Sequence, residues 1–262
     1  MKIFDSHCHL TDKSYRDDFD AVLQRMAEAE VAAAMLVGIT RTDSEATVAL
    51  AESRDNLIAS VGIHPHDAQH ATEADMERLR ELAARPDVRA WGETGLDFNR
   101  MFSPQKDQEH WLRRQLEIAD DLELPLIFHE RDSEGRFLEI LRERYPSGRD
   151  GVVHCFGGTM EEMFAYLELG LHIGITGILT VKGRGADLRE MAPEIPADRI
   201  LVETDAPYLT PVPERNKHRR NEPAFVRTTL LRLAQVRKED PEALADTVWN
   251  NTCRLFRYPE KA

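Results

Sequence analysis

Eight short apolar runs alternate with longer amphipathic segments along this chain, and no other feature limits its fold as strongly. Apolar runs separated by segments of helical periodicity predict βαβ units and a parallel sheet. The predicted strands cover residues 2–9, 33–39, 57–64, 88–93, 125–129, 151–155, 171–175 and 199–205. The predicted helices cover residues 16–30, 43–53, 73–85, 104–122, 133–144, 160–169, 186–192, 223–235 and 241–256.

Eight such units favour a closed (β/α)8 barrel, the TIM barrel, over an open doubly wound sheet. The length of 262 residues falls within the usual size of one such barrel. We therefore expect a single α/β domain over residues 1–262.

Six side chains that are able to bind metals stand at or near the C-terminal ends of five predicted strands. They are His7, His9, Glu93, His129, His154 and Asp205. The C-terminal ends of all strands in a (β/α)8 barrel open onto one face, which carries the active site. We therefore expect these residues to line one pocket.

Five of these residues also have a simpler interpretation. His7 and His9 are two residues apart on a strand, so they share a face, and they would then form a hydrogen-bonded pair. Glu93 would form a buried ion pair with an arginine. His129 and His154 would be core histidines. Their common position at strand ends favours the ligand interpretation.

Asp205 ends the last predicted strand, where it is placed to touch a metal and to accept a proton from water. Glu203 lies two residues earlier on the same face. We assign both carboxylates to catalysis, Glu203 as a partner that orients a ligand or a water molecule. A buried pair of Glu203 with Lys or Arg is the alternative.

Imidazole and carboxylate ligands suit Zn, Mn, Co, Ni or Fe and, with enough water, Mg. Six ligands exceed what one tetrahedral ion needs. We therefore expect two divalent cations (Mg, Mn or Zn) that activate water for hydrolysis, as in two-metal sites.

The composition limits the partners and the compartment. The net charge of −13, from 34 basic and 47 acidic residues, argues against non-specific binding to nucleic acid or to anionic membranes. Metals and a few local cations still permit a phosphate-bearing substrate. Cys8, Cys155 and Cys253 form no disulfide framework. With neither a signal peptide nor an apolar span expected, we predict a cytoplasmic protein without a membrane or an obligate protein partner.

Several segments together carry a resemblance to a known family. They are residues 5–10 (DSHCHL), 62–66 (GIHPH), 92–97 (GETGLD), 154–156 (HCF), 203–209 (ETDAPYL) and 220–223 (RNEP). The chain resembles the TatD-type metal-dependent deoxyribonucleases of the amidohydrolase superfamily, in order and over nearly its whole length. The set of motifs is specific, whereas any one of them alone is not.

The resemblance implies a divalent-metal hydrolase that acts on DNA, often as a 3′-to-5′ exonuclease. In the family pattern, the six residues named above match the metal ligands, and Asp205 also accepts a proton. Some members lack the first histidine pair, which this chain keeps as His7 and His9. The bridging carboxylated lysine of the superfamily has no counterpart here, and Glu93 would take its place.

A basic rim is expected to hold the substrate, which we take to be DNA, single-stranded or at its 3′ ends. The loops after the seventh and eighth strands carry Lys182, Arg184, Arg215, Lys217, His218, Arg219 and Arg220. His64, His66 and Arg131 are further candidates for phosphate contacts, together with Arg220. An ordinary solvated charge run is the alternative for the rim. Phe98 and Tyr208 offer rings for base stacking, although core packing is the simpler interpretation of both.

The sequence therefore predicts a nuclease in which a metal-activated water attacks phosphorus and Asp205 accepts its proton. One alternative is a metal-dependent amidohydrolase or esterase that acts on a carbonyl substrate, such as a lactone or an aminoacyl-tRNA. Another is a non-catalytic metal-binding scaffold.

Overall fold

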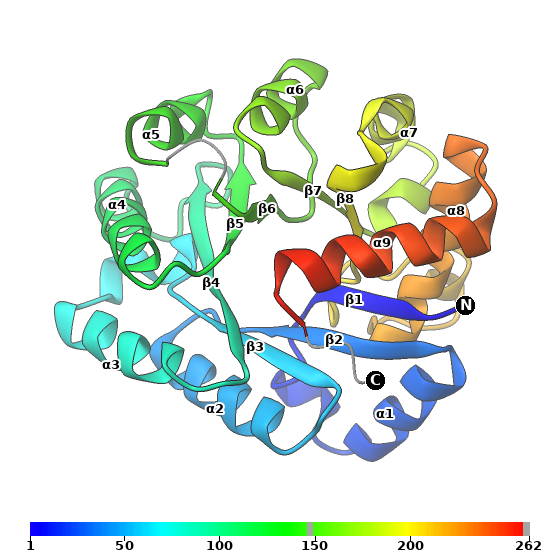
Figure 1. The fold of residues 1–262 in the computed structure, drawn as a ribbon, viewed down its shortest axis with the longest axis horizontal. Helices are drawn as coiled ribbons and strands as arrows, with labels where there is room; N and C mark the ends of the chain where they lie inside the picture. Colours follow the sequence, from blue (N-terminus) through cyan, green and yellow to red (C-terminus); the bar gives the residue numbers. More distant parts are fainter. Residues whose placement is uncertain (146–148, 259–262) are drawn as a thin grey trace. The chain divides into compact units, whose positions relative to one another are not determined.

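The structure is a computed structural model that describes residues 1–145 and 149–258. Strands and helices alternate along these residues (Figure 1). The strands are β1 (Ile3–Cys8), β2 (Val31–Val37), β3 (Leu57–Val61), β4 (Val88–Asp97), β5 (Leu126–Arg131), β6 (Gly151–Val153), β7 (His172–Ile175) and β8 (Ile200–Val202).

The α-helices follow the strands in turn. They are α1 (Phe19–Glu28), α2 (Arg41–Glu52), α3 (Glu73–Ala83), α4 (Gln105–Asp121), α5 (Arg136–Arg144), α6 (Met160–Glu168), α7 (Ala186–Met191), α8 (Val226–Arg237) and α9 (Pro241–Leu255). Short 3-10 helices complete the connections: η1 (Lys13–Tyr15), η2 (Pro65–His70), η3 (Gly177–Thr180), η4 (Ala192–Glu194), η5 (Ala197–Arg199), η6 (Glu214–Asn216) and η7 (Pro223–Phe225). Among the described residues, no helix is both long and apolar enough to cross a membrane.

The sheet has eight strands, and they follow the order of the chain from β1 to β8. Their pairing is parallel, for example between β4 and β5 and between β7 and β8. This is the strand order of a (β/α)8 barrel, so the predicted fold class is confirmed.

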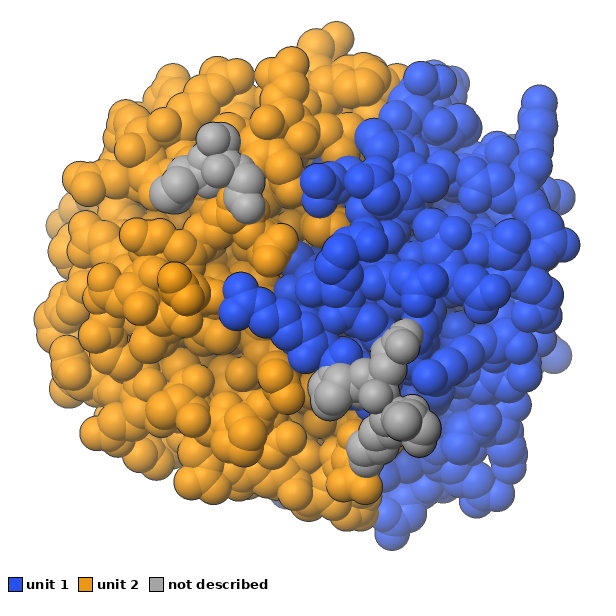
Figure 2. Space-filling view, viewed as in Figure 1, with its two compact units in different colours: residues 1–36, 173–262 blue, residues 37–172 orange. Residues whose placement is uncertain are grey.

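The chain divides into two compact units, which Figure 2 colours separately. Unit 1 comprises residues 1–36 and 173–262, and unit 2 comprises residues 37–172. Within unit 1, β1 pairs with β2, β7 pairs with β8, and Cys8 bridges to Ala206. Within unit 2, β3, β4, β5 and β6 pair in sequence. The prediction of one domain over residues 1–262 stays a prediction, and its last residues, 259–262, lie outside the described part.

Aromatic side chains pack on the buried strands within each unit. In unit 2, the ring of Phe128 lies 5.3 Å from that of Phe137 and 5.7 Å from that of Tyr145, measured between centroids. In unit 1, the ring of Phe4 lies 5.6 Å from that of Trp249 on α9. These contacts fix the strands whose C-terminal ends carry the functional residues.

The strands β4 and β8 end at residues other than the predicted ones, and both ends lie beside functional residues. β4 runs on to Asp97, because Thr94–Asp97 pair with Phe128–Arg131 of β5. Gly95 permits this pairing, since a Cβ at its positive φ of 155° would stand 1.8 Å from the backbone oxygen of His129. β8 in turn stops at Val202, three residues before the predicted end.

Candidate metal centre

Unit 1 brings together three of the predicted ligands, at the ends of β1 and β8. The Nε2 atoms of His7 and His9 lie 3.3 Å apart. Asp205 Oδ1 lies 3.4 Å from His9 Nε2 and 3.8 Å from His7 Nε2. Cys8 faces away, with Sγ 3.5 Å from the backbone oxygen of Met35. The alternation along β1 therefore places both imidazoles on one face, as predicted.

The turn after β8 holds Asp205 in a left-handed conformation with a φ of 57°. Its backbone N–H donates to the carbonyl of His7 at 2.9 Å. Asn221, which is fully buried, donates its amide to the carbonyls of Thr204 and Tyr208 at 2.9 and 2.6 Å. Asn221 thereby fixes the turn on both sides of Asp205. It belongs to the motif at residues 220–223, from which this role was not predicted.

Asp5 links β1 to the same turn. Its carboxyl accepts hydrogen bonds from the backbone N–H of Thr204 at 2.8 Å, from the Thr204 hydroxyl at 2.6 Å, and from the backbone N–H of His7 at 3.4 Å. Burial raises the pKa of Asp5 to about 8, against the opposite influence of these bonds. One buried side chain thus fixes the backbone beside two predicted ligands.

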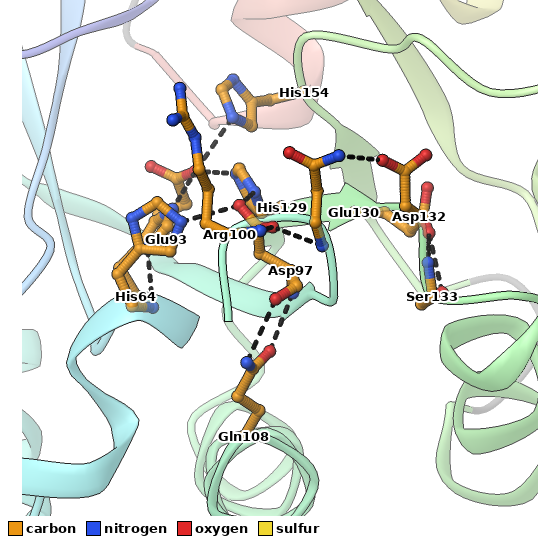
Figure 3. A network of polar contacts seen from close by, with 12 residues as sticks. His64, Glu93, Asp97, Arg100, Gln108, His129, Glu130, Asp132, Ser133 and His154 are labelled. Carbon is orange, nitrogen blue, oxygen red and sulfur yellow. Dashed lines mark hydrogen bonds and ion pairs between the residues drawn. The ribbon is translucent and has the colours of Figure 1, made fainter. Parts of the chain in front are cut away.

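Unit 2 brings the other three predicted ligands around a single oxygen atom (Figure 3). Glu93 Oε1 lies 2.9 Å from His129 Nδ1 and 2.9 Å from His154 Nε2. Glu93 is only 2% exposed. Burial opposes its ionisation, but the surrounding histidines, with His154 the strongest, prevail and hold the pKa of Glu93 well below its usual range.

The structure places His64 and His66 in this cluster too, although the sequence suggested only phosphate contacts for them. His64 Nε2 lies 3.3 Å from Glu93 Oε1, and His66 Nε2 lies 2.7 Å from Asp97 Oδ2. Nitrogen atoms of His64, His66 and His129 fall within 4.8 Å of one another. Their proposed role as substrate ligands stays a prediction.

His64 presents a hydrogen-bond donor to the cluster. Its Nδ1 accepts the backbone N–H of His66 at 3.0 Å, at the start of η2. A neutral imidazole has one N–H, so Nε2 carries the proton and faces Glu93. Burial is the main cause that lowers the pKa of His64 to about 4, which keeps the ring neutral at neutral pH.

Asp97 is a member of this cluster to which the sequence alone gave no role. It ends β4, is almost fully buried, and contacts both His66 and His129. Its pKa lies below the usual range because hydrogen bonds to His129 and His66 outweigh the effect of burial. The signal in the sequence was its spacing from Glu93, four residues along a strand and therefore on the same face.

The two arginines predicted to contact phosphate, Arg220 and Arg131, have different surroundings. Arg220 donates both Nη groups to the carboxylate of Asp18, each at 2.7 Å, and its guanidinium lies 4.6 Å from the ring centre of Tyr15. A substrate phosphate would therefore compete with Asp18 for Arg220. Arg131 ends β5 and is partly buried.

Glu203 is fully buried, and its Oε2 accepts the hydroxyl of Ser6 at 3.3 Å. A Cβ at Gly174 would stand 2.6 Å from the same oxygen, so a glycine at this position leaves the room that Glu203 needs. The catalytic role of Glu203 stays a prediction.

The predicted basic rim is exposed and belongs to unit 1. Lys182, Arg184, Arg215, Lys217 and Arg219 are all exposed. The loops that carry them are joined by a hydrogen bond, since the backbone N–H of Val212 donates to the Thr180 hydroxyl at 2.8 Å.

The aromatic side chains that are exposed are not the ones expected from the sequence. Tyr208 is 55% exposed, so core packing is the wrong interpretation of this residue. Phe98 is partly buried. Phe102, which the sequence did not single out, is 58% exposed, and its ring lies 4.8 Å from that of His66.

A (β/α)8 barrel with histidine and carboxylate groups at its strand ends defines a class of metal-dependent hydrolases. The family model for TatD related DNase matches residues 4–257. The chain therefore belongs to the TatD related DNase family, which confirms the resemblance drawn from its motifs.

Relatives and solved structures agree with this assignment. The protein named 3′-5′ ssDNA/RNA exonuclease TatD from Rahnella sp. (strain Y9602) is 42% identical over 97% of this chain and 98% of its own length. The protein of the same name from Erwinia billingiae (strain Eb661) is 41% identical over 98% and 100%. A crystal structure of YJJV, a TatD homologue from Escherichia coli K12, matches with a TM-score of 0.91 at 30% identity, covering 98% of both chains.

Membership of this family makes the chain a nuclease, a hydrolase that acts on ester bonds. Its histidine and carboxylate groups are able to hold metal ions. The prediction of a metal-dependent hydrolase is confirmed at this level, in preference to the non-catalytic scaffold.

Proposed function

We propose that the chain is a 3′-to-5′ exonuclease for single-stranded DNA that works with two divalent cations, one held in each unit. The observation that carries this proposal is the convergence of imidazole nitrogens on one buried carboxylate oxygen, Glu93 Oε1. The names of the relatives from Rahnella and Erwinia support the substrate class and the polarity.

The donor atoms fit such cations. His7, His9 and Asp205 would hold one cation in unit 1, and Glu93, His129 and His154 would hold the other in unit 2. Both sets combine imidazole nitrogen with carboxylate oxygen, a mixture that suits Mn or Zn, and Mg when water completes the shell. Divalent cations held there would polarise the phosphodiester and lower the pKa of water.

The remaining steps belong to side chains of the protein. Asp205 accepts the proton of the attacking water, and its side chain is 14% exposed, so solvent reaches it. Glu203 supports this end of β8 through Ser6. A phosphate oxygen that displaces Glu93 from the Nε2–H of His64 would accept this hydrogen bond, which stabilises negative charge as the bond breaks.

The basic rim holds the flanking phosphates. Lys182, Arg184, Arg215, Lys217 and Arg219 are exposed in joined loops of an otherwise acidic chain. We also propose His66, Arg131 and Arg220 as phosphate ligands, and Arg220 contributes only where a phosphate displaces Asp18. Phosphate contacts of this kind position a strand without reading its sequence.

A metal-swap assay on end-labelled single-stranded oligonucleotides tests the proposal. We expect the chelated protein to be inactive, Mg or Mn to restore cleavage, and a 5′ label to remain on a ladder of products shortened from the 3′ end. Activity on a lactone or an aminoacyl-tRNA, with none on oligonucleotides, would instead support the carbonyl hydrolase. Full cleavage in excess chelator would refute the metal dependence.

A further inference from the structure

We propose that Asp97 is a positioning residue that sets the tautomer of His129, so that the lone pair of His129 Nδ1 faces Glu93 Oε1. The inference rests on the proposed function only in taking His129 as a metal ligand. Every residue in the argument belongs to unit 2, and Figure 3 labels Asp97, His129 and Glu93 within their polar network.

Both ring nitrogens of His129 face carboxylates. Nδ1 lies 2.9 Å from Glu93 Oε1, and Nε2 lies 3.2 Å from Asp97 Oδ2. A neutral imidazole carries one N–H, so only one of these carboxylates receives a hydrogen bond from it. The hydrogen bonds around Asp97 decide which of the two carboxylates receives it.

Asp97 cannot turn away from the two imidazoles. Its Oδ1 accepts the backbone N–H groups of Asn99 and Arg100, at 3.0 and 2.7 Å. Gln108 clamps its backbone, accepting the N–H of Asp97 at 2.8 Å and donating to its carbonyl at 3.1 Å. Asp97 Oδ2 therefore remains fixed toward the rings.

Asp97 Oδ2 receives two imidazole N–H groups. It lies 2.7 Å from His66 Nε2 and 3.2 Å from His129 Nε2. An ionised carboxylate only accepts, so both Nε2 atoms act as donors. The remaining nitrogen of the neutral His129 ring, Nδ1, then holds a lone pair opposite Glu93 Oε1, and the two electron-pair donors at 2.9 Å are joined by a cation, either a metal ion or a proton on Nδ1.

This arrangement matches the general behaviour of metal-binding histidines, which donate the second ring N–H to a carboxylate. That carboxylate fixes the tautomer and raises the basicity of the ligand. His64 has the opposite arrangement in the same cluster. Its Nδ1 accepts a backbone N–H, and its Nε2–H faces Glu93. The cluster thus presents one imidazole as a ligand and another as a donor.

Asp97→Asn is the sharpest test, because it exchanges one oxygen for an NH₂ group. The amide oxygen has to keep accepting the N–H groups of Asn99 and Arg100, so the NH₂ group faces both rings. A donor then opposes the donor of His129, and the proton of His129 moves to Nδ1, where it blocks metal binding.

Two measurements distinguish a positioning role of Asp97 from a general loss of structure in the variant. We expect a loss of roughly 10- to 100-fold in the affinity for Zn or Mn at this group, measured by calorimetry. In the metal-free protein at alkaline pH, ¹⁵N NMR should show the Nε2–H tautomer of His129 in the wild type and the Nδ1–H tautomer in the variant. Wild-type affinity, or a loss of affinity without the change of tautomer, would overturn the proposal.

A matched control and a second variant complete the experiment. Asp132→Asn makes the same chemical change in a carboxylate that accepts from Asn99 at 2.7 Å and, within the described residues, forms no hydrogen bond or ion pair with a histidine, and it should leave metal affinity within twofold. Should Asp97→Asn fail to fold, Gln108→Ala loosens the clamp, and we expect a metal affinity several-fold weaker. Unchanged affinity in that variant would equally overturn the proposal. DNA cleavage enters neither readout, so the proposed nuclease activity is tested separately.

Discussion

At the scale of single residues, the partner of one ring nitrogen decides what an imidazole does. His64 and His129 lie in one cluster, their ring centres 4.4 Å apart. Because Nδ1 of His64 accepts a backbone N–H and Nε2 of His129 faces Asp97, the two rings present opposite groups to Glu93. Residue types in the sequence could not distinguish them, since both histidines simply follow apolar strands.

Replacing Asp205 by Asn should reduce turnover by roughly 100-fold or more, since a proton acceptor contributes a factor of about 10²–10⁴. Metal content should stay near the wild-type value, because the amide oxygen keeps one ligand atom. Steady-state cleavage of an oligonucleotide and elemental analysis check both points. Asp132→Asn is the matched control, since Asp132 also has a positive φ of 54°. Unchanged turnover in Asp205→Asn would remove its assigned role.

Asp18 should make stability depend on pH in the acid range. The hydrogen bond from Arg220 is the main cause that lowers the pKa of Asp18 to about 2, and Arg25 adds to it. A folded-state pKa below the unfolded value gives a contribution that is present above pH 4 and lost as the pH falls toward 2. Asp18 is partly exposed, so we expect less than about 1 kcal/mol. Urea unfolding at pH 5 and pH 3 should show a smaller pH effect in Asp18→Asn than in the wild type.

At the scale of elements, the strand ends were the least predictable part of the fold. The alternation of apolar runs indicated each strand and its position in the chain. It did not show that β4 continues to Asp97 or that β8 stops at Val202, because both ends depend on contacts with distant residues. Gly95 allows the first, and hydrogen bonds from Thr204 to Asp5 accompany the second.

Asp5→Ala should destabilise the turn after β8. The substitution leaves the buried Thr204 backbone N–H without its acceptor, and it leaves the Thr204 hydroxyl only the His7 carbonyl at 3.4 Å. An unsatisfied buried donor costs about 1–3 kcal/mol, so we expect the free energy of unfolding to fall by roughly 2–4 kcal/mol. Chemical denaturation measures this loss. A change below about 0.5 kcal/mol would show that Asp5 does not hold this turn.

Phe102→Ala should weaken binding of oligonucleotides, because the exposed ring beside His66 offers a stacking surface. Stacking of one base on an aromatic ring contributes about 1–3 kcal/mol, so we expect KM for single-stranded DNA to rise roughly 5- to 100-fold. Hydrolysis of a small phosphodiester without a base should be unaffected. Phe164→Ala, which removes another exposed phenylalanine from α6, is the control. An equal loss on both substrates would argue against stacking.

At the scale of the whole molecule, the sequence allowed the net charge and the fold to be predicted. It did not allow the arrangement of charged and hydrogen-bonding groups in the site to be predicted. Eight alternating units and their motifs indicated the barrel and the family. The parts that the sequence left open, such as Asp97 and Asn221, act through hydrogen bonds to residues distant in sequence. Such contacts have no local periodicity. The spacing from Glu93 indicates the face of the strand on which Asp97 lies, but only coordinates reveal its partners.

The basic rim should make substrate binding depend on salt despite the net charge of −13. Each phosphate neutralised on a single strand changes the slope of log K against log salt by about −0.7. Lys182→Ala with Arg184→Ala removes two cations and should therefore weaken binding and reduce that slope by about 1.4, measured by fluorescence anisotropy at several salt concentrations. An unchanged slope would favour an ordinary solvated charge run.

The central claim is that each unit holds a divalent cation, and native mass spectrometry of the zinc-loaded protein tests it most directly. We predict about two zinc ions per chain in the wild type and about one in His7→Asn with His9→Asn, because the ligands of unit 2 remain intact. Glu93→Ala, which leaves no ligand oxygen at this position, should likewise reduce the count, through the other group. A wild-type chain that binds no zinc, or variants that bind as many ions as the wild type, would contradict this account.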